Sequence, residues 1–218
     1  MKTLDRLMRK LRKPIIGKSL EKKGSYSSRS YIESFLKKYD SPSIYQNLFE
    51  ECYDKSSLAT KTNIRHSKKI KFGDSLSDIV AIKNSNSLII KEMAPFSLLF
   101  SRTRIGNYKA KSVMSFYNMK LFAYNYSFSC LDEEDRSNII GNIHEKYLDK
   151  NSSFDIEKNS IIDQFGNCLL IEDQVNLTIY YTKLKEGIYN NLLLLSKEEK
   201  ENKALLAEYQ KNELQLRL

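Results

Sequence analysis

The side chains best suited to metal or phosphoester chemistry in this sequence are its carboxylates, and four of them are consecutive, at positions 132–135. A divalent cation needs several oxygen ligands that converge on one point, but consecutive helical residues point in different directions. The positive end of a helix dipole gives such a run a sufficient structural role. We therefore interpret residues 132–135 as the start of a helix. A metal site would have to be assembled from scattered acids, such as Asp74, Asp78, Asp163 and Asp173.

Histidine and cysteine, which commonly act as bases, nucleophiles or metal ligands, are few and far apart. His66 lies in a basic stretch, His144 lies in a predicted helix, and no HExxH pattern is present. Three cysteines, at positions 52, 130 and 168, form no CxxC pair. This spacing is typical of reduced thiols in a cytosolic protein. No glycine-rich phosphate loop follows a predicted strand. The sequence thus assigns no catalytic residue, metal ligand or cofactor.

Basic and aromatic residues alternate around a predicted turn at residues 105–107. Such a combination suits phosphate contacts with an aromatic stacking partner. The same charges also suit the end of a hairpin, where lysine and arginine discourage pairing with another sheet. The candidate binding residues of this stretch are Arg102, Arg104, Tyr108, Lys109 and Lys111.

The net charge of +9 originates in the first third of the chain. Residues 1–72 hold 18 Lys and Arg against seven Asp and Glu, whereas residues 73–218 hold 18 against 20. Apolar residues from Leu4 to Ile15 recur at helical spacing, with most basic residues off that stripe. A basic amphipathic helix binds nucleic acid, an anionic membrane surface or a protein, or packs on its own domain. The candidate partner-binding residues are Arg6, Arg9, Lys10, Arg12 and Lys13.

The spacing of apolar residues predicts helices first, then strands, then helices with a hairpin between them. Helical stripes span residues 32–39 and 44–52, with Ser41 as the N-cap and Pro42 as the first residue of the second helix. Residues 17–30 and 54–68 are polar and predicted to be irregular, and residues 70–72 form a short strand. Period-two alternation then predicts strands at 87–93, 96–103, 109–117 and 121–128. A helix at 132–147, a strand within 155–163, a hairpin of 168–171 and 175–182, and a helix from 186 complete the chain.

This order predicts an α+β fold, with an antiparallel β-meander, helices on one face, a helical N-terminal region and a long C-terminal helix. We divide the chain into a basic amphipathic segment at 1–23, a helical N-terminal region at 24–68 and an α+β core domain at 69–218. The C-terminal helix offers a homo-oligomer contact, although its apolar positions hold no clean heptad.

These features favour a non-enzymatic intracellular binding or adaptor protein whose basic N-terminal segment contacts an acidic partner protein, nucleic acid or a membrane surface. The alternatives are a metal-dependent enzyme acting on nucleic acid or another phosphoester, and an RNA- or DNA-binding protein. No apolar run approaches the roughly 20 residues that span a bilayer, and the first 20 residues lack the apolar stretch of a secretion signal. We therefore expect a cytoplasmic protein with at most peripheral membrane contact and no transmembrane segment.

Overall fold

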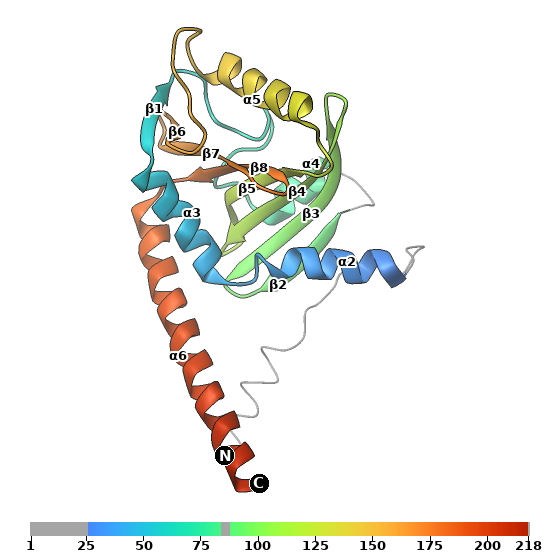
Figure 1. Cartoon of the computed structure of the whole chain (residues 1–218), viewed down its shortest axis with the longest axis vertical. Coiled ribbons are helices and arrows are strands. Elements are labelled where there is room, and N and C mark those ends of the chain that lie inside the picture. The colour runs from blue at the N-terminus through green and yellow to red at the C-terminus, as the bar shows by residue number, and fades with distance from the viewer. Residues whose placement is uncertain (1–25, 84–87, 218) are drawn as a thin grey trace.

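One mixed sheet of eight strands organises the part of the chain that the computed structural model describes, residues 26–83 and 88–217 (Figure 1). The strand order is β1-β6-β7-β8-β5-β4-β3-β2. Every neighbouring pair is antiparallel except β1 and β6, which run parallel. The strands are β1 (Ser56–Thr60), β2 (Ile89–Met93), β3 (Phe96–Ile105), β4 (Tyr108–Tyr117), β5 (Lys120–Phe128), β6 (Asn159–Asp163), β7 (Asn167–Asp173) and β8 (Leu177–Lys183).

Helices cover both faces of this sheet (Figure 1). The helices of the described chain are α2 (Tyr26–Lys37), α3 (Pro42–Asp54), α4 (Leu76–Lys83), α5 (Glu133–Tyr147) and α6 (Glu186–Arg217). Helices α2, α3 and the first part of α6 pack on one face, and α4 and α5 pack on the other. The predicted α+β class, meander, N-terminal helices and long C-terminal helix are confirmed. The prediction placed helices on one face, and the structure adds the layer of α4 and α5 on the opposite one.

Local sequence signals explain where two of these helices begin. The hydroxyl oxygen of Ser41 accepts a hydrogen bond from the backbone N–H of Ser43, and Pro42 occupies the first helical position of α3. Asp132 caps α5 in the same way, because its Oδ1 atom accepts from the N–H of Asp135 at 2.8 Å. These contacts satisfy helix N–H groups that have no partner within the helix.

The two faces of the sheet carry separate hydrophobic cores. One core joins the sheet to α4, α5 and the connection at 61–75, around buried residues such as Tyr124, Phe128 and Ile143. The other joins the sheet to α2, α3 and α6, around residues such as Phe49 and Leu192. Both α2 and α3, which belong to the predicted helical N-terminal region, therefore pack directly on the sheet, and β1 extends that sheet.

Three local predictions were wrong. Residues 56–60 were predicted to be irregular but form β1, which is specified by pairing with the distant β6 rather than by an apolar pattern of its own. Residues 70–72 were predicted to be a strand but form an irregular segment that leads into a turn at 72–73, and Ile70 is buried in the core that contains α4 and α5. Residues 26–30 were predicted to lie in a linker, but they form the beginning of α2.

Helix α6 extends well beyond the globular body (Figure 1). Its first half packs on α3, where the rings of Phe49 and Tyr189 stack at 6.1 Å and Leu192 is fully buried. Further along, the hydroxyl of Ser41 donates a 2.5 Å hydrogen bond to Glu199. Residues beyond this point project away from the sheet. Within the described ranges, no helix combines the length and the apolar character needed to cross a bilayer.

Candidate functional site

Four basic side chains of the β3–β4 hairpin lie on one face of the sheet, and we call them the basic hairpin face. The strand register pairs Arg102 with Lys111 and Arg104 with Lys109. Directly paired residues share a face, and residues two apart on a strand share it too. The face is the one covered by α2, because Phe100 and Val113, two positions before Arg102 and two after Lys111, belong to the α2 and α3 core.

Tyr108 lies on the opposite face of the same hairpin. It pairs with Ile105, packs at the edge of the core beneath α5, and its ring lies 6.5 Å from that of Phe128. Desolvation and a hydrogen bond with Asp135 raise the pKa of its hydroxyl. The structure therefore brings together the four predicted basic residues and separates them from the tyrosine that was predicted to stack beside them.

Helix α2 supplies aromatic rings to the basic hairpin face instead. The Nζ atom of Lys111 lies 5.1 Å from the ring centroid of Tyr31 and 5.1 Å from that of Phe35, at cation–π distance. The same Nζ atom donates a 3.1 Å hydrogen bond to the hydroxyl of Ser129. Lys38 extends the arrangement, since its Nζ atom lies 5.5 Å from the Phe35 centroid and 4.8 Å from that of Tyr39.

This part of α2 was missed as a binding surface. Tyr31 and Phe35 are spaced by four residues, which places them on one side of α2, and Tyr39 follows four residues later, just beyond the end of that helix at Lys37. The spacing is visible in the sequence, but only the packing of α2 on the sheet shows that lysines lie between the rings. Tyr31 keeps 46% of its surface exposed beside Lys111, so its ring is open to a ligand.

Positive charge is concentrated and unneutralised at this surface. Within residues 26–83 and 88–217, Arg102, Arg104 and Lys109 are exposed and make no ion pair. Desolvation lowers the pKa of the Lys38 ammonium, Glu172 raises it, and the neighbouring Lys111 lowers it. Like charges paired directly across two strands destabilise a hairpin. The arrangement therefore carries a local energetic cost that an anionic ligand would relieve.

The scattered acids considered as metal ligands have separate structural partners. Asp74 accepts from the N–H of Lys71 at 2.8 Å, Asp78 accepts from the hydroxyl of Ser75 at 2.6 Å, and Asp173 pairs with Arg136. Asp163 is buried, and its two oxygens accept four hydrogen bonds from Ile64, Phe165 and Asn167. No group of three or more His, Cys, Asp or Glu residues with metal-binding geometry occurs in the described part of the chain.

The histidines lie apart from each other, whereas two of the three cysteines are neighbours. His66 packs its ring against Tyr124 at 5.3 Å, and Nε2 of His144 lies 2.8 Å from the carbonyl oxygen of Ser152. Cys52 and Cys168 lie together in the core beneath α3 as free thiols, where a hydrogen bond with Cys168, followed by desolvation, raises the pKa of Cys52, whereas Cys130 is exposed. Each histidine and each buried cysteine therefore has a packing or hydrogen-bonding partner, and Cys130 faces solvent. The predicted basic residues Arg6, Arg9, Lys10, Arg12 and Lys13 lie outside the described residues.

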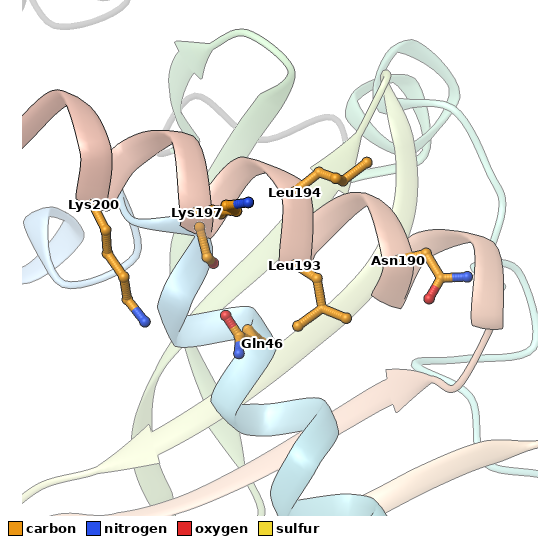
Figure 2. Close-up of a pocket in the computed structure, with 7 residues that line it drawn as sticks. Gln46, Asn190, Leu193, Leu194, Lys197 and Lys200 are labelled. Atoms are coloured by element: carbon orange, nitrogen blue, oxygen red, sulfur yellow. The ribbon is translucent and has the colours of Figure 1, made fainter.

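A second surface feature is a groove between α3 and α6 (Figure 2). Leu193 and Leu194 provide its apolar lining, and both are exposed. Lys197 and Lys200 lie along the α6 side, while Gln46 approaches from α3. Among the described residues that line the groove, none is acidic. Its chemistry suits an apolar side chain flanked by carboxylates.

Comparison with known proteins adds no assignment to this site. The chain matches no protein-family model, no curated protein and no solved structure. The functional argument therefore depends on the geometry and charge described above.

Proposed function

We propose that this protein is a non-enzymatic binding protein that recognises a polyanion through the basic hairpin face and the adjoining rings of α2, together with its basic N-terminal segment. The observation that carries the proposal is the pairing of Arg102 with Lys111 and of Arg104 with Lys109 directly across two strands, with no ion pair to any described acid at Arg102, Arg104 or Lys109. An acidic protein segment, nucleic acid and an anionic membrane each carry the negative charge that this basic surface would bind.

The adjoining α2 rings support a ligand with both charge and flat apolar surface. Tyr31 and Phe35 hold Lys111 beside the sheet, and the exposed part of Tyr31 continues the surface outward. Aromatic side chains next to lysine and arginine favour nucleic acid bases and aromatic side chains of a protein partner. The proposal also includes a cytoplasmic location for the protein.

The experiment compares binding of the intact protein to heparin, used as a model polyanion, with that of a variant carrying Arg102→Glu, Arg104→Glu and Lys109→Glu. We expect the variant to elute from heparin at lower salt and its dissociation constant to rise about tenfold or more, since lost ion contacts weaken polyanion binding and its salt dependence. Arg102→Glu places opposite charges across the strands at Lys111, while Arg104→Glu with Lys109→Glu exchanges one like-charged pair for another, so repulsion across the hairpin should not increase.

A charge-matched control separates local contact from net charge. Lys61→Glu, Lys150→Glu and Lys185→Glu change the net charge by the same amount as the hairpin substitutions. These lysines are exposed, form no ion pair within the described chain and lie outside the hairpin. We expect this control to lose much less affinity. Equal losses in the two variants would mean that heparin responds only to overall charge, and the proposed surface would be wrong.

A further inference from the structure

The part of α6 beyond the body exposes apolar side chains that a monomer would leave in water. Five of the twelve large apolar residues exposed in the described chain lie on this helix: Leu193, Leu194, Leu205, Leu206 and Tyr209. Leu194, Leu205 and Tyr209 are each more than 60% exposed. Residues 200–217 would extend about 27 Å from the body at the usual helical rise. An isolated helix of this length is marginal in water without a packed face.

Two of these exposed leucines share one side of the helix with two acids. Leu194, Glu201, Leu205 and Glu208 follow one another at intervals of seven, four and three residues, which places them along one stripe. We call residues 201–209 the arm and residues 190–200, where α6 forms the groove with α3, the base. The arm carries Glu201, Lys203 and Glu208 beside its apolar residues. The base carries Lys197, Glu198, Glu199 and Lys200, of which the two lysines line the groove with Leu193 and Leu194, and Glu199 is ion-paired with Lys203 at 2.6 Å.

The groove lining, which carries two lysines, and the arm, which has one more acid than base, therefore complement each other in charge and in apolar character. The last 21 residues of α6 up to Arg217, from Lys197 onward, hold five basic and five acidic residues, so two copies do not repel there. Parallel alignment would oppose Lys197 with Lys197 and Glu208 with Glu208. Antiparallel alignment places the arm of one copy over the groove of the other, so that Lys197 and Lys200 of the lining approach Glu201 and Glu208 of the arm, and leucines approach leucine and tyrosine.

We propose that two copies of this chain pair through antiparallel α6 helices, with the arm of each copy seated in the α3–α6 groove of the other (Figure 2). The contact is isologous, since each copy contributes the same base and the same arm. It goes beyond polyanion binding and does not depend on it. A dimer would also present two basic hairpin faces on one particle.

The oligomeric state of the full chain tests this proposal. Light scattering coupled to size-exclusion chromatography should give a mass of about 51 kDa, twice the chain mass of 25.5 kDa, with dissociation on dilution. Leu205→Glu combined with Tyr209→Glu should shift the protein to the monomer or raise the dimer dissociation constant at least about tenfold. The matched control, Ala207→Glu with Gln210→Glu, adds the same charge to exposed positions on the opposite side of the arm and should remain dimeric.

Charge reversal tests the antiparallel alignment separately. Lys197→Glu with Lys200→Glu should weaken the dimer, and so should Glu201→Lys with Glu208→Lys. A chain carrying all four changes restores unlike charges between base and arm, so it should recover most of the lost affinity. Circular dichroism of each variant checks that α6 remains helical.

Several results would overturn the proposal. A wild-type monomer at all concentrations would do so, as would a dimer that persists unchanged in the Leu205→Glu and Tyr209→Glu variant. Failure of the four-substitution chain to recover affinity would exclude the antiparallel pairing. If the intact chain is monomeric and dimerises only after removal of residues 1–23, that segment occupies the groove in place of a second copy.

Discussion

Lys111 is the residue at which the strands and α2 meet in the candidate binding surface. Its backbone pairs with Arg102, its ammonium group donates to Ser129, and its charge lies beside Tyr31 and Phe35. A lysine side chain held in this way loses rotamer freedom before any ligand arrives, which lowers the entropy cost of binding. Arg102, Arg104 and Lys109 keep their freedom and their hydration, so they suit the outer part of the contact.

His66 occupies a very different environment on the other face of the sheet. Its ring contacts Tyr124 and Tyr126, and Lys83 approaches from α4. Desolvation, followed by the positive charge of Lys83, lowers the pKa of His66 to about 4. The folded protein therefore holds this histidine in its neutral form at neutral pH.

We expect His66 to make the fold sensitive to acid. Because the folded-state pKa lies below the unfolded value of about 6.5, the stabilisation is complete above pH 6.5 and is lost as the pH falls towards 4. The shift corresponds to at most about 3 kcal/mol. Urea unfolding at a series of pH values should show this loss in the wild type and a flatter profile in His66→Phe. His144→Gln is the histidine control, and a loss unchanged in His66→Phe would refute the assignment.

At the scale of elements, α3 is the helix that joins the sheet to α6. Phe49 is fully buried and stacks on Tyr189 of α6, while Tyr45 reaches the sheet and donates a 3.1 Å hydrogen bond to Ser115 of β4. Cys52 lies one helical turn after Phe49, and its carbonyl oxygen accepts a hydrogen bond from the hydroxyl of Ser160 of β6. One side of α3 thus contacts elements from both halves of the chain.

Phe49→Ala should therefore destabilise the whole fold. Removal of a fully buried phenylalanine side chain costs about 3–5 kcal/mol through lost burial and the cavity left behind. Tyr53→Ala removes an aromatic ring of similar size on the same helix that is 52% exposed and contacts Tyr189 edge-on, so it should cost only about 1 kcal/mol. Chemical unfolding of both variants measures the difference. Similar losses would show that α3 is not anchored through its buried side.

The meander could be predicted from the sequence because its strands are consecutive and their side chains alternate between two faces. The same alternation could have separated Tyr108 from Arg104 and Lys109, since its position on the strand assigns it to the other face. Strand β1 could not be predicted, because its five residues have a weak apolar pattern and its partner lies in another part of the chain. The contribution of α2 to the basic surface was equally hidden, since it depends on how that helix packs.

At the scale of the whole molecule, positive charge is unevenly divided between the described fold and the segment before it. Residues 1–23 hold nine basic and two acidic residues, while residues 24–218 hold 27 and 25. The described fold is thus close to neutral overall, yet it keeps a local basic surface at the hairpin. Affinity for a polyanion should therefore have two separable contributions.

Deletion of residues 1–23 should remove one of them while leaving the fold intact, because the described residues already form two extensive hydrophobic cores. We expect an unchanged thermal unfolding midpoint, weaker heparin binding and a smaller dependence of binding on salt. Combining the deletion with the three hairpin substitutions should abolish most of the remaining binding. A truncated protein that binds heparin as tightly as the full chain would assign the entire interaction to the hairpin.

The parallel pairing of β1 with β6 has a consequence for the order in which the protein forms during synthesis. Ser57 and Ser160, which face each other across this pair, are separated by 103 residues. The core beneath α3 also needs Cys168, Leu170 and Leu192 from the last quarter of the chain. A ribosome must therefore release most of the polypeptide before this layer can close. Until then the meander, whose contacts are local, is the part able to fold first, and the apolar side of α3 stays available to chaperones.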